Sequence, residues 1–251
     1  MIRSLRTLCW LFLLAGLAPL AATVWVSFSP DSFLTPPTGE WSLRWYGRFF
    51  ADPRWTTAAG RSLLVAVTSA ALGVTLAVPV ALSKSRRLPL VMLLPAVVPP
   101  VALGLGLLPL FHRIGLWGTT AGVVLAHTAL GLPVVFLLLR TRYGQQLVEC
   151  ELAARGLGAN RWLVFRRITL PLLRPAILAA FAVQFVLSWN EALVTVFLTT
   201  PATETLPVVM WSQLRGSASP LVAVAGVLSA GTSLVAVAAL ARTTAGSPRR
   251  R

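Results

Sequence analysis

The sequence predicts an all-α membrane protein with about six transmembrane helices. Three observations support this fold class. Of the 251 residues, 56% are hydrophobic and only 12% are charged, whereas about 25% of residues are charged in soluble domains. Apolar runs of roughly 20 residues recur along the chain, the length that an α-helix needs to cross about 30 Å of hydrocarbon. The basic residues lie mainly between these runs.

Six apolar runs are predicted to span the membrane, within a single transmembrane domain that covers residues 1–251. The runs are residues 8–28, 62–82, 88–110, 119–139, 176–196 and 221–240, and a disordered basic tail is expected over residues 242–251. The first run could instead be a cleaved signal peptide, because Arg3 and Arg6 precede it and small residues surround Ala21. It continues to Phe28, however, which is long for a signal peptide and favours an uncleaved span.

Charge sets the expected orientation. Most of the 22 lysine and arginine residues lie in the N-terminal segment, residues 83–87, residues 140–174 and the tail. Because cytoplasmic segments carry the excess of basic residues, both termini are predicted to be cytoplasmic. The outward segment, residues 29–61, is rich in aromatic residues, which prefer the membrane interface. It either lies on the outer leaflet or also forms part of a docking surface for an outside partner.

Several functions are disfavoured. The net charge of +15 could indicate nucleic-acid binding, but it is spread over short segments between apolar runs rather than along one basic face. No G-x-x-x-x-G-K-[ST] phosphate-binding loop occurs. His112, His127, Cys9 and Cys150 are too few and too scattered to predict a metal site or a disulfide. We therefore expect no enzyme activity and no bound cofactor in this chain.

Residues 140–175 form the longest predicted cytoplasmic loop. Ala153 and Ala154 favour a helix, Gly158 can end it in a left-handed conformation, and Asn160 is a suitable N-cap for the next helix. Pro171 marks re-entry into the membrane. The second helix is expected to carry an apolar stripe formed by Trp162, Phe165, Ile168 and Leu172. Such a loop could lie flat on an anionic leaflet, or it could be the handle through which a soluble motor moves the spans.

The same loop resembles the cytoplasmic loop of ABC importer permeases, which is patterned E-A-A, three residues, G, nine residues, I-x-L-P. This chain has ELAARGLGANRWLVFRRITLP over residues 151–171, and its alanines, Gly158 and the I-T-L-P stretch match. The family glutamate would fall at Leu152, whereas Glu151 comes one residue earlier, a rotation of about 100° on a helix. Either Glu151 reaches the ATPase from a neighbouring direction, or that ion pair is absent.

By resemblance, residues 152–160 are the coupling helix that docks in a groove of an ATPase subunit. The residues that the resemblance implicates in ATPase coupling are Glu151, Leu152, Ala153, Ala154, Gly158, Ala159, Ile168, Leu170 and Pro171.

Other stretches, including WSLRWYGRFF and SWNEALVTVFLTT, are similar to polyamine-type permeases such as those for spermidine and putrescine. The resemblance implies a type I ABC importer permease fold in the bacterial inner membrane. It also implies an ATPase dimer that carries ATP and Mg, a second and different permease subunit, and an extracytoplasmic solute-binding protein. The solute would be a small organic compound, such as a polyamine or another amine-bearing compound, although SWNEA is less acidic than that family's usual sequence.

Polar residues in the fifth run are the candidates for the substrate pathway, because polar groups within a membrane usually face a bundle interior or a wet cavity. Gln184, Ser188 and Glu191 fall on one helical face at i, i+4 and i+7. Glu191 could instead extend outward to the interface, and His127 could simply bridge two helices. The full candidate set is Gln184, Ser188, Trp189, Asn190, Glu191 and His127.

Two other functions stay open. A self-sufficient secondary transporter or channel usually has more spans or internal repeats, and no clear repeat relates the halves of this chain. A membrane-bound enzyme would need a cluster of ionisable groups among the spans, for which only Glu191 and His127 are available.

Overall fold

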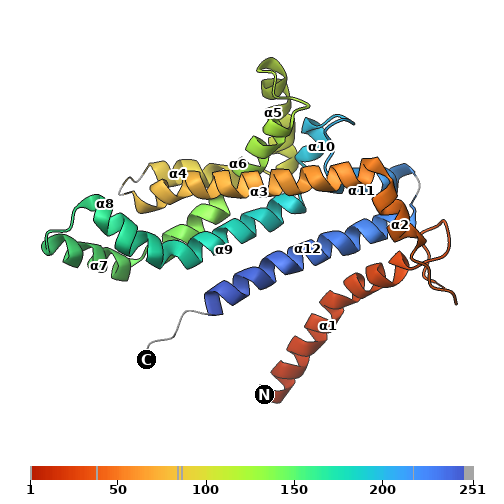
Figure 1. The fold of residues 1–251 in the computed structure, drawn as a ribbon, viewed down its shortest axis with the longest axis horizontal. Helices are drawn as coiled ribbons and strands as arrows, with labels where there is room; N and C mark the ends of the chain where they lie inside the picture. The colour runs from red at the N-terminus through yellow and green to blue at the C-terminus, as the bar shows by residue number, and fades with distance from the viewer. Residues whose placement is uncertain (1, 38, 84, 86, 217, 246–251) are drawn as a thin grey trace. The chain divides into compact units, whose positions relative to one another are not determined.

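The computed structural model describes residues 2–37, 39–83, 85, 87–216 and 218–245. Every element within them is helical, which confirms the predicted all-α class (Figure 1). The elements in chain order are α1 (Ile2–Ser27), α2 (Arg44–Ala51), α3 (Pro53–Leu82), α4 (Leu88–Leu93), η1 (Leu94–Val97), α5 (Pro100–Arg113), α6 (Thr120–Arg142), α7 (Gln145–Gly156), α8 (Arg161–Val164), η2 (Phe165–Thr169), α9 (Leu170–Trp189), α10 (Thr195–Leu198), α11 (Leu206–Gly216) and α12 (Pro220–Ala245).

Four helical stretches are long and apolar enough to cross a membrane. They are Pro53–Leu82, Thr120–Arg142, Arg161–Trp189 and Pro220–Arg242. A fifth arises if α4–η1 and α5 count as one broken span. The apolar part of α1 with described side chains, Ala15–Ser27, is shorter than a span. Six spans therefore remain a prediction, of which four or five are present in the described part of the chain.

The third predicted span is sharply bent. The helices Leu88–Val97 and Pro100–Arg113 meet at an angle of 107°. Pro99 is extended at φ −56°, ψ 140°, and a second proline occupies the first turn of α5. A proline lacks the N–H that would continue a helix and disfavours helical geometry in the residue before it. The Pro99–Pro100 pair therefore breaks the run that the sequence read as one span.

Two predicted boundaries are wrong. The fifth span does not reach Val196, because its helix ends at Trp189 and the chain turns before α10; at its other end the helix begins at Arg161, within the predicted loop. The last helix continues to Ala245, so residues 242–245 are helical rather than part of a disordered tail. Residues 246–251 of that predicted tail lie outside the described residues.

The chain divides into two compact units. The first comprises residues 1–60 and 205–232. In it Trp45, Phe49 and Trp55 are buried, the Trp45 indole donates to the Asp31 carbonyl at 3.0 Å, and Trp41 is exposed. Part of the aromatic segment predicted to lie on the outer leaflet thus forms a small folded core.

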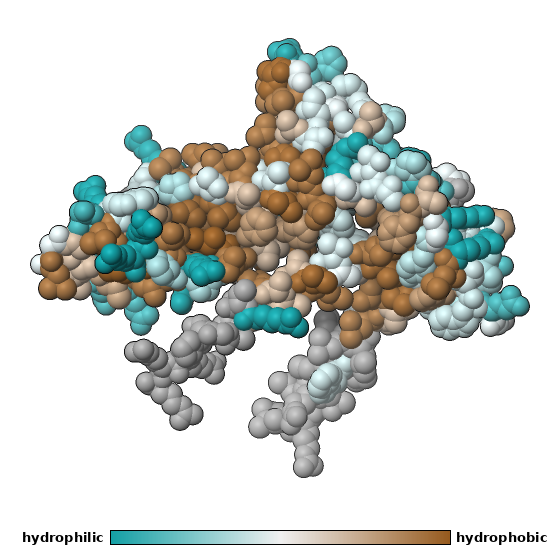
Figure 2. All heavy atoms as spheres, in the orientation of Figure 1, coloured by the Kyte–Doolittle hydropathy of each residue, from teal (hydrophilic) through white to brown (hydrophobic). Residues whose placement is uncertain are grey.

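The second unit comprises residues 61–204 and 233–251, and its core lies between α3, α6 and α9. Here α6 and α9 pack along each other. In Figure 2 hydrophobic residues cover much of this unit around α3, α4 and α9, while hydrophilic residues gather at the end formed by α7 and α8. The buried residues of this core are Val74, Ala77, Val80, Ala81, Val135, Phe136, Leu139 and Ala180.

Candidate functional site

Two clusters in the second unit contain the residues that the sequence singled out. The first is the α7–α8 hairpin. Its α7 helix ends before Gly158, which has φ +88°, and the N–H of Gly158 donates to the Arg155 carbonyl at 3.0 Å. Asn160 then caps α8, since its side-chain oxygen accepts from the Leu163 N–H at 2.8 Å. The expected pair of helices around a glycine turn is therefore present.

The hairpin presents apolar residues to its surroundings. Leu152 is 61% exposed and Leu157 is 90% exposed, and Ala153 is exposed beside the groove between α7 and α9. Exposed leucines at the tip of a projecting hairpin form a surface that a partner could cover.

Glu151 faces a different side of α7 from Leu152, about 100° around the helix. It is only 9% exposed, and Tyr143 donates its hydroxyl to Oε2 at 3.0 Å, while the Thr169 hydroxyl donates to Oε1. Arg155 lies 3.9 Å from Oε2. Burial, followed by the hydrogen bond to Glu151, raises the pKa of Tyr143, so the phenol stays protonated and donates. The Glu151 carboxylate therefore bonds within the chain, and the choice between the two alternatives for its contact with an ATPase stays a prediction.

The expected apolar stripe of the second helix is largely exposed. Trp162 is 67% and Leu172 is 42% exposed, whereas Val164, Thr169 and Leu173 are buried. The second helix contains η2, a π-helical turn in which the Leu170 N–H donates to the Phe165 carbonyl five residues back. The extra residue in this wider turn changes the spacing of the buried positions from the α-helical pattern.

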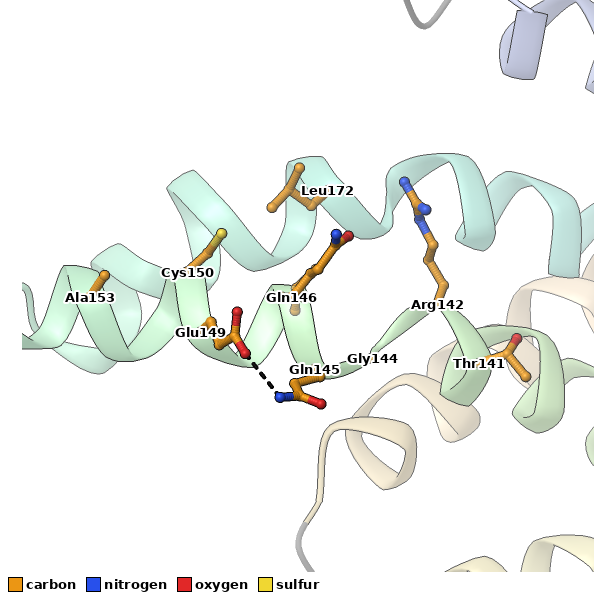
Figure 3. Close-up of a pocket in the computed structure, with 10 residues that line it drawn as sticks. Thr141, Arg142, Gly144, Gln145, Gln146, Glu149, Cys150, Ala153 and Leu172 are labelled. Atoms are coloured by element: carbon orange, nitrogen blue, oxygen red, sulfur yellow. Dashed lines mark hydrogen bonds between the residues drawn. The ribbon is translucent and has the colours of Figure 1, made fainter. Parts of the chain in front are cut away.

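A groove of about 700 Å³ separates the first part of α7 from α9 (Figure 3). Gln146 and Cys150 of α7 and Leu172 of α9 border it, and Gln145 donates to Glu149 at 3.1 Å on its outer side. Helix α7 packs instead on α8 and η2. The hydrogen bond from Thr169 to Glu151 adds a buried polar link between α7 and the base of α9.

The second cluster is a buried polar network at the other end of α9. The two ring nitrogens of His127 each lie 2.7 Å from a hydroxyl, Nδ1 from that of Ser188 and Nε2 from that of Thr195. Nε2 is also 3.4 Å from the Glu191 carboxylate. That carboxylate accepts from the N–H of Val194 at 2.9 Å and of Thr195 at 3.1 Å. Glu191 thus caps α10 and fixes the turn that follows α9.

Most of the predicted pathway residues are in this network. Gln184 is fully buried and donates to the His127 carbonyl at 2.8 Å, so the i, i+4, i+7 face does converge. Trp189 is buried and stacks on Phe185. Asn190 alone of the six is exposed. Sequence reasoning missed Thr195, Tyr143 and Thr169, since each is an ordinary residue whose role depends on a partner in another structural element.

The described residues contain no group of three or more His, Cys, Asp or Glu side chains that could hold a metal ion.

A solved structure shares this fold. A chain in the crystal structure of a bacterial ABC transporter involved in the import of the acidic polysaccharide alginate matches with a TM-score of 0.64 and 17% identity. The match covers 96% of this chain and 94% of that one. Together with its candidate spans, this gives the chain the fold of an ABC transporter permease, a multi-pass membrane subunit.

Sequence comparison gives the family. The chain belongs to the binding-protein-dependent transport system inner membrane components, whose profile matches residues 69–243. The putrescine transport system permease protein PotI of Escherichia coli is 33% identical over 218 residues, which cover 81% of this chain and 77% of that protein. The spermidine/putrescine transport system permease protein PotC of Escherichia coli is 30% identical over 205 residues (79% and 78%).

A relative with a different stated cargo is equally similar. The molybdenum transport system permease protein ModB of Mycobacterium tuberculosis is 33% identical over 234 residues, covering 84% of this chain and 88% of that protein. These matches confirm the resemblance drawn from the loop: the chain is an ABC importer permease of the inner membrane, a transport subunit rather than an enzyme.

Proposed function

We propose that this chain forms half of the translocation pathway for a small organic solute, and that residues 149–171 couple it to a separate ATPase subunit. The observation that carries the proposal is the α7–α8 hairpin, a projecting element with an outward apolar surface and an inward polar anchor. A helix pair of this kind can transmit a push from a soluble motor to the helix on which it is anchored.

The proposed assembly contains an ATPase dimer that binds ATP and Mg, a second permease subunit of different sequence, and an extracytoplasmic solute-binding protein. The chain would cross the bacterial inner membrane six times with both termini in the cytoplasm, as the distribution of basic residues indicates. The first span would be formed by α1, and the third by the bent pair α4–η1 and α5.

The proposed solute is an amine-bearing compound such as a polyamine. It is supported by the similarity to PotI and PotC, whose names state putrescine and spermidine transport. ModB, whose name states molybdenum transport, has the same percentage identity as PotI, so overall identity does not distinguish between these solutes. Glu191 is engaged with His127 and α10. Asn190, the exposed member of the candidate set, donates to the Val186 carbonyl at 2.9 Å and to the Ser233 hydroxyl at 3.2 Å, and the buried members would act by shaping the turn beside it.

Purification of the tagged chain from native membranes tests the assembly. Recovery with an ATPase that contains a phosphate-binding loop and with a second permease supports the importer, and the accompanying binding protein can then be screened for amines. Recovery of the chain alone, as a homo-oligomer that takes up solute with an ion gradient, would instead support the alternative of a self-sufficient secondary transporter or channel.

Replacing Gly158 by valine is expected to uncouple transport. Gly158 has φ +88°, a left-handed conformation that costs a side-chain-bearing residue about 1–2 kcal/mol, so the turn between α7 and α8 must rearrange. We expect solute uptake and solute-stimulated ATP hydrolysis to fall about tenfold, measured on reconstituted complexes.

Gly156→Ala is the matched control for Gly158→Val. Gly156 lies in the same hairpin, in α7, and a Cβ there meets nothing within 4 Å. This variant should retain uptake, and full uptake by Gly158→Val as well would contradict the role of the hairpin turn.

A further inference from the structure

The Glu151 carboxylate joins three parts of the chain. Its hydrogen-bond partners are Tyr143, which precedes α7, and Thr169, which ends η2 at the base of α9. Arg155, one turn further along α7, lies at 3.9 Å. The buried Glu151 side chain therefore joins the middle of α7 to the residue that precedes α7 and to the base of α9. At its other end, α9 reaches the polar network around His127.

The position of this carboxylate distinguishes two roles that the sequence motif cannot tell apart: contact with an ATPase, and bonding within the chain. A residue that pairs with an ATPase must be reachable, but Glu151 is 9% and Thr169 is 2% exposed. Leu152 and Leu157 occupy the outward side of the hairpin instead. The one-residue shift of the glutamate relative to the family pattern thus moves the charge from the outer face of α7 to its inner face.

The surroundings of this link are consistent with such a role. A groove bordered by Gln146, Cys150 and Leu172 lies between α7 and α9 (Figure 3), and α7 packs on α8 and η2. Thr169 lies in a π-helical turn, a feature that frequently marks functional sites in helices. The exposed Arg155 adds a weaker, solvent-screened interaction at the rim.

We propose that Glu151 is a positioning residue for coupling: through Tyr143 and Thr169 it fixes α7 to the base of α9, so that the two move together when an ATPase pushes the hairpin. This inference rests on the proposed function and assigns to Glu151 an internal role, distinct from contact with the ATPase. Thr169 and Tyr143 share that role.

The test compares variants within the purified complex of the full chain with its ATPase. Thr169→Val removes the hydroxyl that Glu151 accepts from and keeps the side-chain shape, and Tyr143→Phe removes the second donor. Each is expected to lower solute-stimulated ATP hydrolysis about tenfold, the effect of losing one hydrogen bond to a charged group, with the ATPase still co-purifying in wild-type amount. Thr169→Ser keeps the hydroxyl and should restore stimulation.

Two further measurements test whether Glu151 acts by positioning the hairpin. A spin label at Leu157→Cys, with both native cysteines replaced by serine, should become more mobile in Thr169→Val and not in Thr169→Ser. In a double-variant cycle, Glu151→Gln combined with Thr169→Val should be no worse than the more severe single variant, because both remove the same link.

The outcomes are separable. Full stimulation in Thr169→Val, or loss of ATPase co-purification in Glu151→Gln alone, would overturn the inference and return Glu151 to a direct contact. A wild-type chain that binds no ATPase would refute the proposed function itself, which is a different result.

Discussion

Replacing Glu191 by alanine is expected to destabilise the protein more than any other single change at a polar residue. The carboxylate accepts from the N–H groups of Val194 and Thr195, and it lies beside the buried His127 ring. Its removal leaves these groups unpaired in an enclosed site. The expected loss is about 2–5 kcal/mol, which lowers the unfolding midpoint of a chain of this size by on the order of 10 °C.

Thermal unfolding of the detergent-solubilised chain measures this effect. Asn190→Ala is the comparison, because it removes an adjacent exposed side chain whose neutral hydrogen bonds to the Val186 carbonyl and the Ser233 hydroxyl contribute about 1 kcal/mol each, so its midpoint should fall less than that of Glu191→Ala. A Glu191→Ala protein with an unchanged midpoint but no uptake would contradict the structural role and would favour direct contact between Glu191 and the solute.

Gly131→Ala is expected to have the second large effect. An added Cβ on Gly131 of α6 would overlap the whole amide group of Gln184 on α9, and Gln184 is fully buried. The amide would have to move, giving up its bond to the His127 carbonyl, or the two helices would have to separate. Overpacking of this kind typically costs about 1–3 kcal/mol, and the lost hydrogen bond adds about 1 kcal/mol.

The matched control for Gly131→Ala faces the same side chain. A Cβ on Gly73 of α3 would lie 3.7 Å from Gln184, an ordinary contact, so Gly73→Ala should express and unfold like the wild type. Combining Gly131→Ala with Gln184→Ala removes the overlap and should recover folded protein, monitored by size-exclusion chromatography. Failure of this second change to restore any stability would show that the glycine is needed for another reason.

The fold class was predictable because hydrophobic composition and run length act on whole segments. The bend at Pro99–Pro100 was also accessible, since proline constrains its own backbone and that of the residue before it. The end of the fifth span was not. Its apolar residues continue past Trp189, and the turn depends on Glu191 meeting the N–H groups of Val194 and Thr195 and the ring of His127, the last from a different helix.

Within the candidate site, too, features set by local sequence were predictable and features set by contacts between elements were not. The glycine turn of the hairpin follows from Gly158 and Asn160, whose conformational and capping preferences are local. The inward orientation of Glu151 depends on Tyr143 and on Thr169, 18 residues further along the chain. Helical periodicity also failed at Thr169, since a π-helical turn has no distinctive composition and the expected stripe assumed 3.6 residues per turn throughout.

The π-helical turn at Phe165–Thr169 has a consequence for how the chain tolerates changes in length. A deletion inside a helix normally rotates everything before it out of register by about 100°. Here, removing one exposed residue such as Arg166 would let the turn relax to an α-helix with an unbroken axis, so the span itself would survive. The hairpin ahead of it would keep nearly its present direction, because the wider turn already accommodates one extra residue without rotating the helices on either side. Shortening the helix by one residue at this turn would thus preserve both insertion and the side of the hairpin that is offered to a partner, whereas the same deletion further along α9 would rotate the hairpin.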